Sequence, residues 1–210
     1  MKVIALVNQK GGSGKTQAAV HLAWEAHRQR RVAVLDLDPT HQSRNWIEAA
    51  KMEIDAEAIN LRQVDLSGYV EEIRKGGEYD LVIIDTPAND LNAAMEALMV
   101  SDAVIVPVGV GTSDIGMLAS TARQIKRMQQ VREANSIQPA PVRVLINRSG
   151  FAPARTGRTV EAVETFGLPT FKARIPLLGA YQEATGNRIT GQQHHYAPVL
   201  KEIFDALAQN

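Results

Sequence analysis

The segment Lys10-Gly11-Gly12-Ser13-Gly14-Lys15-Thr16 decides the fold of this chain. A short apolar run from Lys2 to Asn8 precedes it, and apolar residues at helical spacing follow it as far as Ala26. A strand, a glycine-rich loop and a helix in this order predict a phosphate-binding loop, because glycines let successive backbone N–H groups turn toward an anion and the helix adds its positive end. By average residue frequencies such a string arises by chance on the order of once in ten thousand chains of this length.

Each part of this loop has an expected role toward a nucleotide. The Lys15 ammonium would reach the β- and γ-phosphates, and the Thr16 hydroxyl would occupy one position on Mg²⁺. The nucleotide-binding residues expected from the loop itself are Gly11, Gly12, Ser13, Gly14, Lys15, Thr16 and Gln17. Position 9 is Gln where the strict pattern has Gly, and Lys10 is an additional cation that needs an anion of its own.

The rest of the chain predicts an α/β fold. Four more apolar runs, at 32–36, 81–85, 103–108 and 142–147, are continuous and rich in Val and Ile. Such runs are typical of strands buried on both faces, and helical patterns at 91–100 and 115–131 separate some of them. We expect a doubly wound, mostly parallel sheet with helices on both faces, formed by a single domain over residues 1–210.

Composition narrows the class of protein. The chain has 210 residues, 45% of them hydrophobic and 22% charged, which is typical of a globular protein. It has no cysteine, which excludes disulfides and cysteine-ligated iron–sulfur clusters. No apolar run approaches the roughly 20 residues that span a bilayer, and Met1-Lys2 leads directly into a strand rather than a signal peptide. We expect a cytoplasmic protein that does not associate with membranes.

A second motif ends the run Leu81-Val82-Ile83-Ile84 with Asp85-Thr86-Pro87. An apolar strand that ends in a carboxylate is typical of a Walker B element. Asp85 would then hold Mg²⁺ through a water molecule, and Thr86-Pro87 would begin a loop that senses the γ-phosphate.

The additional lysine introduces a family resemblance. The string Lys-Gly-Gly-x-Gly-Lys-Thr resembles the deviant Walker A motif of the ParA/MinD ATPases. In that family the first lysine crosses a dimer interface to the partner's nucleotide, so the resemblance implies an ATP-dependent homodimer in which Lys10 has this role. It also implies weak intrinsic ATP hydrolysis with Lys10, Lys15 and Asp38 as the catalytic residues. The alternative for Lys10 is an ordinary solvated loop lysine.

The segment Asp36-Leu37-Asp38-Pro39 resembles the family's Asp-x-Asp-Pro-Gln motif. The resemblance places Asp36 near the water shell of the metal and makes Asp38 the residue that orients the attacking water. Thr40 stands where the family usually has Gln, which puts contacts from that position in question. The alternative for both carboxylates is a turn before a helix, where Asp is favoured.

Later segments extend the resemblance over nearly the whole chain. These segments are Val106-Pro107-Val108, Asp114, Leu145-Ile146-Asn147-Arg148, Arg174-Ile175-Pro176 and Glu183-Ala184. The resemblance places Asn147, Arg148, Pro176 and Leu177 around the adenine, whereas simple core packing is the alternative for Leu177. The pair His194-His195 is not expected to bind metal, since neighbouring side chains face different ways.

The sequence favours a ParA-type positioning ATPase of the small plasmid-partition kind, which lacks an N-terminal DNA-reading domain. Its ATP-bound dimer would bind DNA nonspecifically, associate with the nucleoid, and be released when a ParB-like adaptor stimulates hydrolysis. Net charge is zero, but residues 123–190 hold eleven Lys and Arg against four Asp and Glu, a surplus of +7. The residues expected to contact DNA phosphates include Arg155, Arg158, Lys172, Arg174 and Arg188. Solvated helix faces, or pairing with Glu161, Glu164 or Glu183, are the alternative.

Other functions of the same family stay open. A MinD-like membrane switch needs a basic amphipathic C-terminal helix, whereas Lys201–Asn210 has one lysine against Glu202 and Asp205 and fits core packing better. A metabolic amidoligase would need a further substrate domain. The cargo is a plasmid, a chromosome, a protein microcompartment or a chemoreceptor array, and no residue of the sequence distinguishes them.

Overall fold

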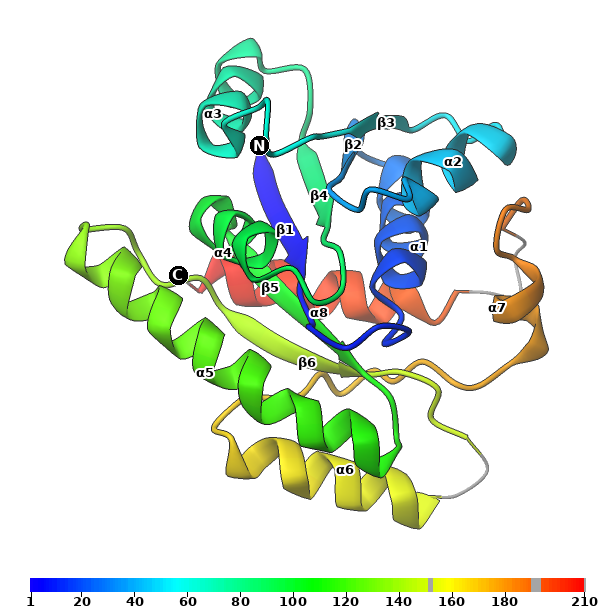
Figure 1. The fold of residues 1–210 in the computed structure, drawn as a ribbon. Coiled ribbons are helices and arrows are strands. Elements are labelled where there is room, and N and C mark those ends of the chain that lie inside the picture. The colour runs from blue at the N-terminus through cyan, green and yellow to red at the C-terminus, as the bar shows by residue number, and fades with distance from the viewer. Residues whose placement is uncertain (151–152, 190–193, 210) are drawn as a thin grey trace.

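The computed structural model of the chain describes residues 1–150, 153–189 and 194–209. Six strands form one sheet in the order β3-β2-β4-β1-β5-β6, and every pair of neighbours is parallel. Helices cover both faces of this sheet (Figure 1), which confirms the predicted doubly wound α/β fold. The strands are β1 (Lys2–Leu6), β2 (Val32–Asp36), β3 (Asp55–Ala58), β4 (Leu81–Asp85), β5 (Ala103–Val108) and β6 (Val142–Ile146). The helices are α1 (Lys15–His27), α2 (Gln42–Ala49), α3 (Leu66–Gly76), α4 (Leu91–Val100), α5 (Thr112–Ala134), α6 (Pro153–Thr165), α7 (Gly179–Glu183) and α8 (Tyr196–Ala208).

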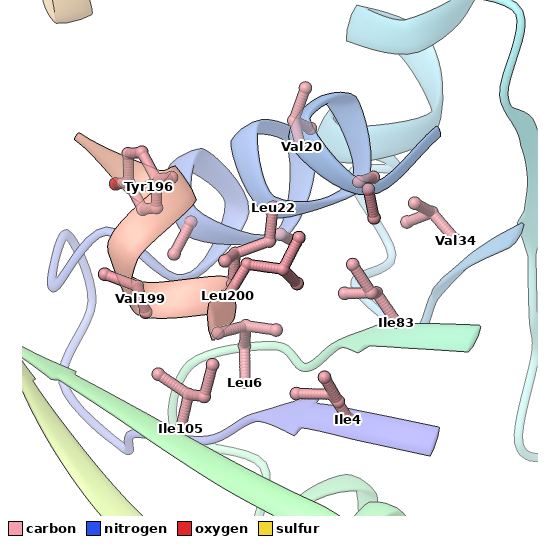
Figure 2. Close-up of a cluster of buried hydrophobic side chains, with 14 of the residues drawn as sticks. Ile4, Leu6, Val20, Leu22, Val34, Ile83, Ile105, Tyr196, Val199 and Leu200 are labelled. Carbon is pink, nitrogen blue, oxygen red and sulfur yellow. The ribbon is translucent and has the colours of Figure 1, made fainter. Parts of the chain in front are cut away.

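Alternate side chains of the strands other than β3 enter two separate cores. On one face Ile4 and Leu6 of β1 pack with residues of α1, α2 and α8 (Figure 2). On the other face Val3 and Ala5 pack with residues of α3, α4, α5 and α6. Because both faces of β1 are fully buried, the strand is a continuous apolar run, as the sequence predicted.

Helix α8 belongs to the first of these cores. Val199 and Ile203 are fully buried there, and the helix lies against α1. The expectation that the C-terminal helix packs into the core is therefore confirmed. In the described part of the chain, no helix combines the length and the apolar character that crossing a membrane requires.

The short strand β3 was not predicted from the sequence. Its residues, Asp-Ala-Glu-Ala, have little strand propensity, and their side chains are exposed or half-buried. Among the described strands β3 pairs only with β2, at the edge of the sheet, so its position comes from backbone hydrogen bonding more than from buried side chains.

The strands that flank the phosphate loop end at the same level. Asp85 of β4 lies in register with Leu6 of β1 and with Asp36 of β2. The Thr86 hydroxyl donates a hydrogen bond to the Leu6 carbonyl at 2.7 Å and ties the loop after β4 to the end of β1. Parallel strands thus bring three separate sequence motifs to one carboxyl edge, where open α/β sheets bind ligands.

Candidate functional site

The loop between β1 and α1 has the backbone conformation of an anion-binding turn. Gly12 and Gly14 have φ values of 70° and 96°, in the left-handed region that favours glycine. The buried Asn8 side chain fixes the start of the loop, since its Nδ2 donates to the Pro107 carbonyl at 2.7 Å and its Oδ1 accepts from the Lys10 N–H at 2.9 Å. The loop therefore has an ordered shape that its own glycines and Asn8 maintain.

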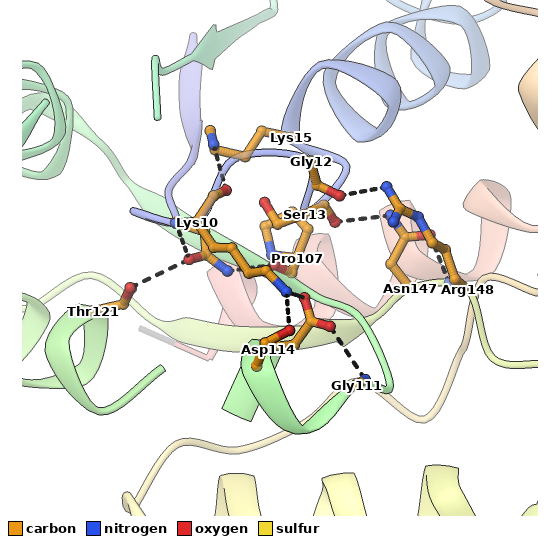
Figure 3. Close-up of polar contacts among 12 residues, drawn as sticks. Lys10, Gly12, Ser13, Lys15, Pro107, Gly111, Asp114, Thr121, Asn147 and Arg148 are labelled. Atoms are coloured by element: carbon orange, nitrogen blue, oxygen red, sulfur yellow. Dashed lines mark hydrogen bonds and ion pairs between the residues drawn. The ribbon is translucent and has the colours of Figure 1, made fainter. Parts of the chain in front are cut away.

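Asn147, one of the residues expected near the adenine, packs directly against this loop (Figure 3). Its Nδ2 donates to the Ser13 carbonyl at 3.1 Å, and a Cβ atom at Gly14 would lie only 1.9 Å from the same nitrogen. Arg148 follows with a φ of 56° and donates from its guanidinium to the Gly12 carbonyl. Hydrogen bonds from Asn147 and Arg148 thus join the residues after β6 to the phosphate loop.

Lys15 begins α1 and is buried, with 6% of its surface exposed. Its Nζ donates to the Lys10 carbonyl at 3.3 Å. Burial lowers the pKa of the ammonium, while the carboxylates of Asp85 and Asp38 act in the opposite direction. A cation that is partly desolvated in this way gains more from an incoming phosphate than an exposed lysine would.

Asp85 is fully buried, and neither of its carboxylate oxygens has a hydrogen-bond partner among the described residues. Burial raises the pKa of this carboxyl to about 7, and the Asp36 charge adds to the shift. The nearby Thr16 and Ser43 hydroxyls and the Lys15 charge oppose it, although neither hydroxyl reaches hydrogen-bond geometry with Asp85. An enclosed carboxylate without partners has lost hydration without replacing it. It therefore has free ligand capacity for a cation or its water shell.

Asp36 is equally buried, but both of its carboxylate oxygens accept hydrogen bonds. Oδ2 accepts from the Ser43 hydroxyl at 2.6 Å and from the Arg44 N–H at 3.0 Å, and Oδ1 accepts from the Asp38 N–H at 3.0 Å. These bonds anchor the start of α2 to the end of β2. Of the two carboxylates expected near the metal, Asp85 is the one with free oxygens.

Asp38 is half-buried and forms a turn with Thr40. Its Oδ1 accepts from the Thr40 N–H at 2.9 Å and from the Thr40 hydroxyl at 2.6 Å. The threonine at the position where the family usually has Gln thus holds the carboxylate expected to orient water. The Lys15 ammonium is close enough for the Asp38 charge to shift its pKa.

The Lys10 side chain folds back onto the start of α5 (Figure 3). Its Nζ lies 2.7 Å from Oδ1 of Asp114 and 2.9 Å from the Ser113 hydroxyl. Asp114 also accepts from the Gly111 N–H and so caps α5. In this single chain the anion that Lys10 needs is Asp114, so Lys10 is not the solvated lysine of the alternative.

The two segments expected around the adenine lie side by side. Ser149 bridges to Pro176, and the Leu177 N–H donates to the Ser149 carbonyl at 3.1 Å. Leu177 is 44% exposed, so the alternative of simple core packing for this residue is wrong. Pro176 and Leu177 thus contact Ser149, the residue that follows Asn147 and Arg148 in the sequence.

Sequence reasoning missed several residues that shape the site. Asn8, Ser43 and Ser113 contact the expected site residues through hydrogen bonds, and no motif marks them. Asp114 belonged to a segment that resembles the family, but the sequence alone assigned it no function. The described residues contain no cluster of three or more His, Cys, Asp or Glu suited to a metal.

A family model described as the CobQ/CobB/MinD/ParA nucleotide binding domain matches residues 4–190. The chain belongs to this family. Among its relatives, the carboxysome distribution protein McdA of Gloeobacter kilaueensis is 30% identical over 189 residues, which cover 87% of this chain and 80% of that protein. The sporulation initiation inhibitor Soj of Bacillus subtilis is 26% identical over 170 residues, 60% of this chain and 66% of that protein.

Solved structures agree on the fold. The septum site-determining protein MinD of Pyrococcus horikoshii, complexed with Mg-ADP, has a TM-score of 0.70 at 19% identity. The match covers 99% of this chain and 97% of that one. The family model over residues 4–190 confirms the ParA/MinD resemblance as family membership, and the candidate nucleotide site lies within these residues.

Proposed function

We propose that this chain is a Mg²⁺-dependent ATPase whose ATP-bound dimer positions a cargo in the cell. The observation that supports this most is the buried Asp85 carboxylate, which has no hydrogen-bond partner among the described residues and lies level with the end of β1, where the phosphate loop begins. Mg²⁺ is usually held by one or two carboxylates together with phosphate oxygens and water, so the residues present fit Mg-ATP. The Mg-ADP complex of the P. horikoshii relative supports the same cofactor.

Different residues of the site would bind Mg-ATP and promote its hydrolysis. Backbone N–H groups from Gly11 to Gly14 and the Lys15 ammonium would hold the phosphates, and Thr16 and Asp85 would hold Mg²⁺. The metal supplies charge neutralisation on the phosphates when bound. Asp38 would accept a hydrogen bond from the attacking water and so orient it, provided that its carboxylate is released from Thr40. Hydrolysis by the isolated protein is then slow, because no arginine finger from a partner stabilises the transition state.

Dimerisation would follow from a competition for Lys10. In the single chain its ammonium pairs with Asp114, and both side chains are largely shielded from solvent, with 22% and 15% exposed. The phosphates of a partner's ATP carry more negative charge than one carboxylate, so bound ATP favours transfer of Lys10 across the interface. ADP, which lacks the γ-phosphate, favours the internal pair.

Three variants test this proposal. Lys15→Ala should abolish ATP binding in calorimetry, whereas Asp38→Ala should bind ATP and lose turnover. Lys10→Ala should bind ATP yet stay monomeric in light scattering with a nonhydrolysable analogue. Wild-type turnover in Asp38→Ala, or equal dimer content for wild type and Lys10→Ala, would contradict the proposed roles of these residues.

A protein cargo is the better supported choice, because the 30% identical relative that spans most of this chain maintains carboxysome distribution. Plasmid or chromosome partition is the second candidate, and relatives named for chromosome partitioning, at 28% and 25% identity, favour the chromosome. A tagged copy imaged with either cargo would distinguish them: a protein assembly should lose its even spacing when the Lys15→Ala variant replaces the wild type.

Nonspecific DNA is the proposed surface on which the dimer moves. Its support is that the expected contacts are exposed and that no ion pair engages them within the described residues. These contacts are Arg155, Arg158, Lys172, Arg174 and Arg188. The suggested pairing with Glu161, Glu164 or Glu183 is therefore not observed in that part of the chain. A mobility shift across a salt series should show binding with the ATP analogue, weak binding with ADP, and steep loss with salt.

A further inference from the structure

A groove of about 690 Å³ lies between α5 and the segments that precede β6 and follow α6, away from the phosphate loop. Its apolar lining includes Ile125, Phe166 and Leu168. Ile125 is buried, whereas Phe166 and Leu168 are only partly buried. The groove thus presents incompletely covered apolar surface at the side of the molecule where α5 and α6 lie together (Figure 1).

Three cations line the same groove, Arg123 and Lys126 from α5 and Arg143 from β6, and no carboxylate does. None of the three forms an ion pair within the described part of the chain. The Nε of Arg143 is in addition enclosed and has no hydrogen-bond partner there. A buried donor without an acceptor destabilises the protein, so a ligand that supplies an acceptor relieves this cost.

The other polar side chain in the groove is already satisfied. Gln129 donates from Nε2 to the Ala140 carbonyl at 2.6 Å and accepts the Ala140 N–H at 3.1 Å. The groove therefore has no free polar side chain among the described residues, apart from the cations, of the kind that small polar ligands require. What fits it is an apolar surface bordered by negative charge.

The α5 wall has the dimensions of a helix-docking surface. Its lining residues from Ala119 to Gln129 recur at helical spacing along one face, which at 1.5 Å per residue spans about 15 Å. The small side chains of Ala119 and Ala122 allow another backbone to approach closely. A helix of two to three turns matches this length.

We propose that this groove docks an acidic amphipathic helix of a partner protein. Its apolar face would cover Phe166 and Leu168, and carboxylates along its edges would pair with Arg123, Lys126 and Arg143. DNA would pair with the cations but would not bury the apolar side chains of the groove, whereas an amphipathic protein helix would do both. This inference does not depend on the proposed ATPase activity.

Both walls of the groove lead to the nucleotide site. The first turn of α5 contains Ser113 and Asp114, which hold Lys10, and Asn147, which contacts the phosphate loop, directly follows β6. A helix that binds across α5 and β6 therefore contacts the two elements whose ends position Lys10 and the loop. A docked partner could therefore respond to, or shift, the positions of Lys10 and the phosphate loop.

The test uses the full chain and two labelled peptides of about 18 residues, each with leucines along one helical face and either Glu or Lys on the remaining faces. Fluorescence anisotropy should show that the wild type binds the Glu peptide, and that Arg123→Glu with Lys126→Glu weakens binding roughly tenfold or more. Arg127→Glu is the matched control, because Arg127 is an exposed cation of α5 outside the groove. Lys15→Ala should bind the Glu peptide like wild type, which separates this test from the ATPase proposal.

Several results would overturn the proposal. These are no binding of the Glu peptide, equal binding of the Lys peptide, or an equal effect of Arg127→Glu and of the double reversal. A double reversal that abolishes binding to duplex DNA or to anionic phosphatidylserine vesicles, while the wild type ignores the Glu peptide, would assign the cations to that polyanion instead. Circular dichroism of each variant verifies that the fold is intact.

Discussion

Replacing Gly14 by Ala tests the contact between the phosphate loop and β6. Gly14 has a φ of 96°, and the added Cβ would lie 1.9 Å from Nδ2 of Asn147. A left-handed conformation costs a non-glycine residue about 1–2 kcal/mol. Displacing Asn147 breaks its 3.1 Å hydrogen bond to the Ser13 carbonyl and leaves a buried amide unpaired, for about 1–3 kcal/mol more. We expect Gly14→Ala to lower the free energy of unfolding by roughly 2–5 kcal/mol.

Urea unfolding followed by circular dichroism measures this loss, and calorimetry with Mg-ATP should show at least about tenfold weaker binding, because the loop can no longer close around phosphate. The two costs are separable, since Asn147→Ala removes the clash but not the backbone strain. In the Gly14→Ala background, Asn147→Ala should therefore cost less than in the wild type, with a coupling of about 1 kcal/mol or more.

Gly116→Ala is the matched control. Gly116 is an exposed position of α5, and a Cβ added there would contact no described atom within 4 Å beyond its chain neighbours and the backbone of its own helix. Alanine should therefore stabilise the protein by about 0.5–1 kcal/mol. The reasoning is refuted if Gly14→Ala changes the unfolding free energy by less than about 0.5 kcal/mol and binds Mg-ATP normally. Additive effects of Gly14→Ala and Asn147→Ala would refute the steric part alone.

Three further predictions concern buried polar groups. Arg132→Met should lower the free energy of unfolding by about 3 kcal/mol, because the guanidinium donates to the Leu98, Met99 and Gln138 carbonyls. The control Arg127→Met, on the same helix, should leave stability unchanged. Equal urea midpoints for the two variants would contradict the role of Arg132. Asp85→Asn should stabilise the nucleotide-free protein at pH 8 by about 1–4 kcal/mol and abolish Mg²⁺-dependent ATP binding. The sign follows because the folded-state pKa of about 7 lies above 3.8, so the wild type loses stability as pH rises toward 7; the advantage of the variant should vanish near pH 4. Trp46→Phe should cost about 1 kcal/mol by removing the 2.8 Å bond from Nε1 to a carbonyl; an unchanged thermal midpoint would contradict that role.

The fold and the phosphate loop were predictable because both depend on local sequence. Continuous Val- and Ile-rich runs mark strands buried on both faces, and the glycines around Lys15 have few alternatives to an anion-binding turn. The edge strand β3 was not predictable, since its position is set by pairing with β2 and not by its own residues. Asp85 could be assigned to the end of a strand, but the absence of hydrogen-bond partners for it in the described structure could not.

What the sequence determined by itself is the phosphate-loop motif and the position of every strand except β3, because motif spacing and hydrophobic period act over short stretches of chain. What only the tertiary structure decided is which of these groups are already paired. Asp36 accepts hydrogen bonds on both oxygens from Ser43 and its neighbours, whereas Asp85 accepts none among the described residues, although both residues end apolar strands. Lys10 is held by Asp114, more than a hundred residues away in the sequence, because parallel strands bring the starts of α1 and α5 to one edge of the sheet.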